Sequence, residues 1–189
     1  MKTSRVVLLG CALLLAACSN VAVVGSGEAV VAERLSVRVE EPWNRFEGGI
    51  AGPIPTWTRE GITVDALQFF VAVQDGKPIA PARDKEKPMI FRAGMQAHEI
   101  VSLFENLYTQ DGSTFKLDRL APDAFLDAEG FRFEFTRLRK SDDVRLSGVG
   151  WAAVRGRELT AIVFSAPRLH FFPSEIAAAE KLARSARLK

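Results

Sequence analysis

The feature that most constrains the fold is an alternation of phenylalanine with polar residues over positions 131–136. Successive side chains of a β-strand point to opposite faces, so Phe131, Phe133 and Phe135 would lie together on one face. This pattern predicts a strand that covers an apolar core on one face only.

Further strands are expected directly after this one. Asp142 and Asp143 predict a turn into a strand over 144–154, and Arg155-Gly156 predicts a second turn into 158–166. Residues 159–166 are almost all apolar, which is typical of a central strand covered on both faces. Short turns between consecutive strands indicate antiparallel pairing.

Two amphipathic helices accompany these strands. Apolar residues of segment 97–109 recur at helical spacing, and Asp111-Gly112 is expected to end that helix. A terminal helix is predicted to open at Pro173. The predicted apolar stripes are Ile100, Leu103, Phe104, Leu107 and Tyr108 in the first helix, and Ile176, Ala179, Leu182, Ala183 and Ala186 in the second. Both stripes need a sheet to pack on, which predicts an α+β fold with an antiparallel sheet.

The first half of the chain predicts shorter strands. Residues 35–40 alternate like a half-buried strand, 55–59 form a short strand, and 62–73 continue extended after a turn at Glu60-Gly61. Asp75-Gly76 carries a hairpin signal, and the charged, proline-rich segment 77–87 is expected to be an exposed loop.

The N-terminus has the pattern of a secretory signal. Lys2 and Arg5 precede an uncharged stretch over 6–17, which is too short to span a bilayer. Leu15-Ala16-Ala17-Cys18 resembles the lipobox of bacterial lipoproteins, which implies cleavage before Cys18 and attachment of lipid, including palmitate, there. Ser19 stands where an inner-membrane retention signal carries Asp, so the resemblance implies the outer membrane, facing the periplasm.

We therefore expect a signal peptide over 1–17, a lipidated N-terminus and tether over 18–32, and one domain over 33–189. The valine- and glycine-rich tether segment is interpreted as a spacer or short edge strand and not as a nucleotide loop, because Val30 occupies the third glycine position. Cys11 would leave with the signal and Cys18 would be lipidated, so no free thiol is expected. Without Lys2 and Arg5 the 25 basic residues fall to 23, matching the 23 acidic ones, and no nucleic-acid partner is expected.

The order of these elements is an amphipathic helix, the meander that begins with strand 131–136 and passes through Trp151 and Phe164, and a helix closing on Leu188. This order resembles the Mog1/PsbP-like fold, an α/β/α sandwich that includes the DcrB-like periplasmic lipoproteins. It is also similar to a group of proteobacterial lipoproteins that have no assigned activity. The resemblance implies binding or assembly roles and no shared active site.

Catalytic and metal-binding patterns are sparse. His98 and His170 are interpreted as a surface residue and a polar contact at a strand-to-helix corner, because neither is accompanied by a triad spacing. Two distant histidines without a free cysteine predict no metal site, and no cofactor is expected. The short basic cluster at 137–140 is expected to decorate a strand end.

Aromatic residues are the remaining candidates for a binding surface. A ligand or partner surface is predicted at Trp43, Phe46, Trp57, His170 and Phe171. The neighbours Phe69 and Phe70 point to opposite faces, so both are buried only if both faces of the sheet are covered. We expect a non-catalytic envelope module that binds a protein partner. The alternatives are a carrier of a small apolar ligand or lipid and, last, a hydrolase-type enzyme.

Overall fold

The structure is a computed structural model that describes residues 21–46, 52–81 and 88–189. The described chain contains the helices α1 (Ala97–Thr109) and α2 (Phe171–Arg184). Its strands are β1 (Val21–Val24), β2 (Gly27–Val31), β3 (Leu35–Val39), β4 (Trp43–Phe46), β5 (Thr56–Thr58), β6 (Ala66–Gln74), β7 (Thr114–Phe125), β8 (Ala128–Leu138), β9 (Arg145–Arg155), β10 (Glu158–Pro167) and β11 (Arg187–Leu188). No helix among these residues is long and apolar enough to cross a membrane.

The strands form two sheets. The larger has eight strands in the order β1-β4-β5-β6-β10-β9-β8-β7, and every neighbouring pair is antiparallel. The smaller has three strands in the order β11-β3-β2. The predicted α+β class and the antiparallel meander β8-β9-β10 are confirmed.

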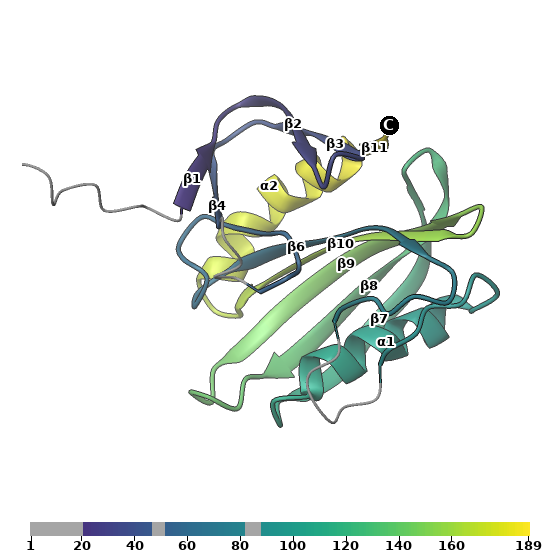
Figure 1. The fold of residues 1–189 in the computed structure, drawn as a ribbon. Coiled ribbons are helices and arrows are strands. Elements are labelled where there is room, and N and C mark those ends of the chain that lie inside the picture. The colour runs from purple at the N-terminus through teal and green to yellow at the C-terminus, as the bar shows by residue number, and fades with distance from the viewer. Residues whose placement is uncertain (1–20, 47–51, 82–87) are drawn as a thin grey trace, which may run out of the picture.

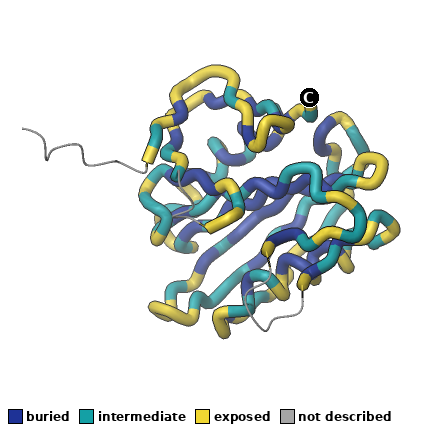
Figure 2. Tube along the Cα trace, viewed as in Figure 1, coloured by how far each residue is buried: buried dark blue, intermediate teal, exposed yellow. Residues whose placement is uncertain are grey.

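The two helices cover opposite faces of the large sheet, and α2 lies between this sheet and the small one (Figure 1). Helix α1 has the predicted bounds, and Glu99 accepts a hydrogen bond from the backbone N–H of Gln96 at 2.7 Å, which caps its first turn. Helix α2 packs Ala179 and Ala183 at full burial, so the small side chains bring it close to the sheet, whereas Ala186 of the predicted stripe is buried beyond the end of the helix. Figure 2 shows the buried residues concentrated along the central strands.

Two apolar cores lie on the two faces of the large sheet. Phe131, Phe133 and Phe135 all belong to the core under α1, as the alternation predicts. Phe69 lies in the core under α2 and Phe70 in the core under α1, so both are buried because both faces are covered.

The core under α1 is tightly packed against glycine. A Cβ atom at Gly148 would lie 2.1 Å from the ring of Phe135, and one at Gly150 would lie 2.2 Å from the ring of Phe133. Only a glycine surface lets these two rings lie flat across β9. The space between these two glycines and the helix is therefore filled by side chains.

The N-terminal segment differs from the expected tether. Strands β1 and β2 occupy residues 21–31, so the structured domain begins well before residue 33. Val24 packs into the core, whereas Val21 and Val23 are exposed on the other face of the outermost strand. This segment is thus an edge strand followed by a strand of the small sheet, one of the two interpretations left open by the sequence. Residues 18–20 lie outside the described part of the chain.

Three element boundaries also differ from expectation. The segment 115–120 is expected as a strand, but strand β7 continues through Pro122 to Phe125 and turns into β8 at Leu126 and Asp127, which both have positive φ. Helix α2 begins at Phe171, so Pro173 lies in the first turn, where backbone donors need no partner. The turn at Asp75-Gly76 ends β6, but β6 pairs with β5 and β10 and not with the segment that follows.

Candidate functional site

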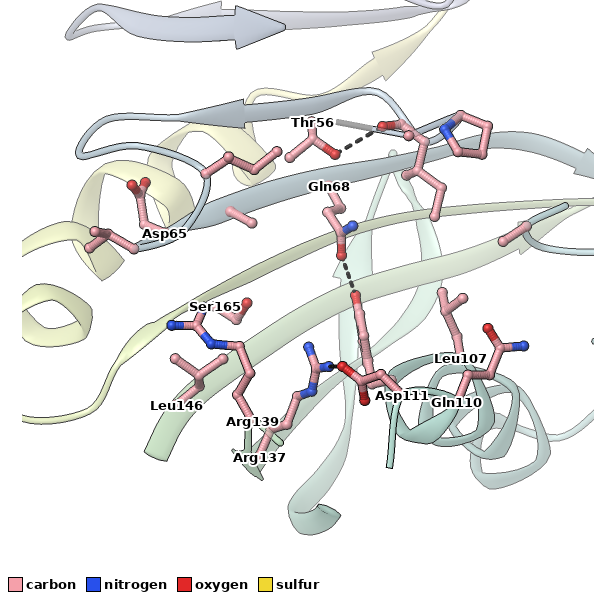
Figure 3. A pocket seen from close by; sticks show the side chains of 18 of the residues that line it. Thr56, Asp65, Gln68, Leu107, Gln110, Asp111, Arg137, Arg139, Leu146 and Ser165 are labelled. Carbon is pink, nitrogen blue, oxygen red and sulfur yellow. Dashed lines mark hydrogen bonds and ion pairs between the residues drawn. The ribbon is translucent and has the colours of Figure 1, made fainter. Parts of the chain in front are cut away.

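A cleft on the α1 side of the sheet has a volume of about 330 Å³ and opens to solvent. It lies between the end of α1, strand β6, the end of β8 and the segments around residues 52–56 and 62–66. We call it the arginine cleft and define it by five residues, which are Gln68, Tyr108, Asp111, Arg137 and Arg139. Figure 3 shows the side chains of Gln68, Asp111 and Arg137 turned toward one another from these elements.

Arg137 reaches the cleft because it continues the alternation of the phenylalanines along β8. Its side chain is 16% exposed and rests on the ring of Tyr108, with Cζ 5.5 Å from the ring centroid. Nη2 donates to Asp111 Oδ2 at 2.8 Å and to Ser113 Oγ at 3.1 Å. Nε is buried and has no hydrogen-bond partner in the described chain.

The aromatic platform beneath Arg137 is rigid. Tyr108 stacks with Phe115 and Phe135, at centroid distances of 6.4 and 5.7 Å, and its hydroxyl donates to Gln68 Oε1 at 2.7 Å. Burial raises the pKa of Tyr108 far above its ordinary value, so the hydroxyl stays a neutral donor.

Asp111 holds one edge of the guanidinium. Burial works to raise its pKa, but hydrogen bonds from Ser113 and the charge of Arg137 outweigh burial and hold the pKa below the ordinary value. Its carboxylate accepts from the backbone N–H of Ser113 at 2.9 Å, which fixes the turn after α1.

Arg139 has a structural role in the same cleft. Its guanidinium makes a paired contact with Asp142, at 2.9 and 2.7 Å, and donates to the carbonyl of Thr63 at 2.8 Å. These bonds tie the β8–β9 turn to the segment after β5. Two neighbouring arginines thus differ, because Arg139 is fully engaged and Arg137 retains unpaired donor capacity.

This arrangement favours recognition of an anionic oxygen. A guanidinium that uses only part of its donors within the chain can still donate charge-assisted hydrogen bonds to an entering carboxylate. Ile54 and Leu107 add apolar surface to the lining, so a ligand group here would be partly apolar and acidic at its tip.

The predicted aromatic surface does not exist as one site. Trp43 and Trp57 are 2% and 4% exposed, and both belong to the core under α2. Trp43 packs edge-on to Phe164 and Trp57 edge-on to Phe69, at centroid distances of 6.3 and 4.8 Å. The prediction is wrong for both tryptophans, because β4 and β5 are sheet strands whose inner faces need large apolar side chains.

The remaining predicted residues are scattered. Phe46 is half-buried on β4 beside Trp57, in a shallow depression at the end of the small sheet. His170 is exposed at the N-cap of α2, with its ring edge-on to the half-buried Phe171 at 4.9 Å. Cys18 lies outside the described residues.

A second charged group of residues lies on the α2 side, and we call it the Arg59 cluster. Arg59 pairs with Glu41 at 2.5 Å and with Glu175 at 2.7 Å, and its Cζ lies 5.8 Å from the ring centroid of Trp43. Burial is the main reason that the pKa of Glu175 is raised, outweighing the attraction of Arg59. The adjoining cavity is about 180 Å³, so the cluster is closed around its own charges.

Neither histidine is set up for catalysis within the described chain. His98 and His170 are exposed, and neither imidazole hydrogen-bonds a carboxylate there. The same described residues hold no group of three or more His, Cys, Asp or Glu side chains placed to bind a metal ion.

Sequence reasoning treated residues 137–140 as decoration of a strand end and missed the cleft. A usable signal was present, since the alternation of Phe131, Phe133 and Phe135 places Arg137 and Arg139 on the same, helix-covered face. Charged residues on a covered face are rare unless paired or functional.

No family model matches the sequence, and no curated protein matches it. Among solved structures, the chain is similar to cyanobacterial PsbP (CyanoP) from Synechocystis sp. PCC 6803, with 9% identity, a TM-score of 0.57, and coverage of 92% of this chain and 95% of that one. The structure of LpqN, involved in cell envelope biogenesis of Mycobacterium tuberculosis, matches with 5% identity and a TM-score of 0.37 over 89% of this chain and 91% of that one; at this score it supports no inference. The fold is PsbP-like, as the order of elements predicts, and identity this low bears on the fold alone.

Proposed function

We propose that this chain is a lipid-anchored, non-catalytic binding module of the bacterial cell envelope, which recognises an acidic side chain of a partner protein in the arginine cleft. The observation that carries the proposal is the guanidinium of Arg137, which lines a cleft open to solvent and has only Nη2 bound to partners in the described chain. Arginines in such pockets are frequent anchors of protein interfaces.

The geometry gives the partner's carboxylate a defined position. Asp111 and Ser113 occupy Nη2 of Arg137 and Nε is buried, which leaves Nη1 for the incoming group. Tyr108 fixes the plane of the guanidinium, and this preorganisation lowers the entropy lost on binding.

The two alternative functions have less support. A carrier of an apolar ligand or lipid needs an enclosed apolar cavity. Phe133 and Phe135 fill the space under the middle of α1 against Gly148 and Gly150, and the apolar groove of about 420 Å³ at the start of α1 is open to solvent. A hydrolase needs an activated nucleophile or base, and the exposed histidines offer neither.

A photo-crosslinking amino acid at Gln110, on the rim of the cleft, tests the proposal in intact cells. We expect a specific envelope protein to be captured, and capture to fall at least about tenfold in Arg137→Met, because a buried charged contact is lost. The matched control places the same probe at Arg155, on an exposed turn at the far end of β9. Equal capture from both positions, or capture insensitive to Arg137, would reject partner binding at the cleft.

The anchor is tested separately. The lipobox-like sequence ending at Cys18 supports lipidation, with the domain facing the periplasm. Cys18→Ala should release the protein from membranes and abolish incorporation of radiolabelled palmitate. Retained labelling would show that Cys18 is not the lipidated residue.

A further inference from the structure

A second groove, of about 580 Å³, lies on the opposite face of the sheet from the arginine cleft, over β7, β8 and β9. Three cations line it, which are Lys116, Arg145 and Arg168. Three hydroxyls line it as well, which are those of Thr114, Thr136 and Ser147. Helix α2 packs on β10, β9 and β3, so this corner of the sheet stays open.

The charge in this groove is largely uncompensated. Asp118 is its one acidic lining residue, and it is already engaged by Lys116 at 3.0 Å and by the hydroxyl of Thr136 at 2.6 Å. Arg145 and Arg168 form no ion pair in the described chain, and their backbones are joined by a hydrogen bond of 3.1 Å. Guanidinium and hydroxyl donors converging from four segments suit phosphate oxygens.

An exposed apolar residue adjoins the cations. Leu169 directly follows Arg168 and is 93% exposed, the highest value among the large apolar residues that are exposed. A leucine projecting beside basic residues is the pattern by which peripheral domains enter the interface of an anionic bilayer.

The strand register relates this groove to the N-terminus. Val23 of β1 is level with Ser165 of β10, through the pairs of β4, β5 and β6, and Ser165 pairs with Gly148 of β9. Arg145 lies three residues from Gly148, about 10 Å along the strand, and β1 is five strand spacings away, about 24 Å. Val21, the first described residue, is level with Gly150 in the middle of β9, so it is about 17 Å from Arg145 along the strand direction and the same five strand spacings across the sheet.

We propose that the end of the domain that carries this groove lies on an anionic membrane, with Lys116, Arg145 and Arg168 binding lipid phosphates and Leu169 inserted at the interface. This inference deepens the proposed function, since it orients the anchored domain. The arginine cleft lies on the other face of the same end of the sheet, so a partner protein would reach it beside the membrane.

The test uses the processed chain without its lipid, residues 18–189 with Cys18→Ser, and vesicles of phosphatidylethanolamine with or without phosphatidylglycerol. We expect cosedimentation only with the anionic vesicles, weakening steeply with salt. Arg145→Glu/Arg168→Glu should weaken binding at least about tenfold, since each basic residue near the surface contributes on the order of fivefold. Leu169→Ser should weaken it about fivefold without affecting folding, because the side chain is exposed.

The matched control is Lys77→Glu/Arg155→Glu, which makes the same charge change at the opposite end of the sheet and should bind like the parent. Equal binding to both kinds of vesicle, or equal loss in the control, would overturn the proposal. Displacement by millimolar inorganic phosphate would also overturn it, since the groove would then take free phosphate and not a membrane. The lipid-free chain makes this result independent of whether Cys18 is lipidated.

Discussion

Two arginines in this molecule have similar surroundings and different consequences. Arg59 and Arg137 each lie over an aromatic ring, at 5.8 and 5.5 Å from the centroid, and each contacts a carboxylate. Arg59 holds two carboxylates beside a cavity of about 180 Å³, whereas Arg137 holds one and faces a cleft of about 330 Å³.

The difference teaches what separates a structural charge from a binding charge. The partners of Arg59 come from the chain itself, including Glu175 of α2, so the Arg59 cluster fastens that helix to the strands. Arg137 has only Nη2 bound to partners in the described chain, and it lines a cleft that is open to solvent. Donors left without a partner beside an open cleft are expected where a ligand completes the site.

The largest effect is expected from breaking the structural pair. Arg59→Met leaves the carboxylate of Glu175, 10% exposed, without its opposite charge, and we expect the free energy of unfolding to fall by about 3 kcal/mol. Urea denaturation measures this loss. The double variant Arg59→Met/Glu175→Leu should recover most of it, because no buried charge then remains. A loss in the single variant below about 1 kcal/mol would place Arg59 with ordinary surface pairs.

A smaller stability effect is expected at the cleft. Arg137→Met loses a cation–π contact and an ion pair with the partly exposed Asp111, but it also removes a buried unpaired donor. These opposing terms should leave a net change within about 1 kcal/mol. Urea denaturation would then show that stability is retained, and crosslinking at Gln110 would show that binding is lost. A loss as large as that of Arg59→Met would make Arg137 structural and erase the contrast.

Much of the fold was predictable because its strongest elements carry their own periodicity. The phenylalanine alternation of β8, the apolar run of β10 and the stripe of α1 each predict an element and the face that it buries. The β7–β8 hairpin was missed because Leu126 and Asp127 adopt positive φ without the usual Asn-Gly signal.

The sites were less predictable, because their residues meet only in three dimensions. The sequence pattern predicts Tyr108 on a helix stripe and Arg137 at a strand end. Nothing in either segment indicates that the ring of Tyr108 lies under the guanidinium of Arg137. The prediction of a binding surface at Trp43 and Trp57 is wrong because their local sequence suggests a site where the fold forms none. Tryptophans beside a glycine-rich loop suit a binding surface, but here short strands carry them into the core.

The smallest and most specific effect is the pH dependence of the free energy of unfolding. Its sign differs between the Arg59 cluster and the arginine cleft. The raised pKa of Glu175, caused mainly by burial, means that the folded state holds this proton more tightly than the unfolded chain. The unfolded state then binds fewer protons from pH 4.5, the ordinary value, up to the raised folded pKa, so stability falls as pH rises through that window. The lowered pKa of Asp111 acts in reverse, and its contribution is lost as pH falls below 3.8.

Unfolding free energies of Glu175→Gln and Asp111→Asn, measured against pH beside the parent, separate the two contributions. Glu175→Gln should flatten the decline above pH 4.5, and Asp111→Asn should flatten the loss at the acidic end. If Glu175→Gln instead steepened the decline, Arg59 would dominate over burial at Glu175. The closed cluster would then be a net attraction, and its contrast with the open cleft would rest on the unpaired donor of Arg137 alone.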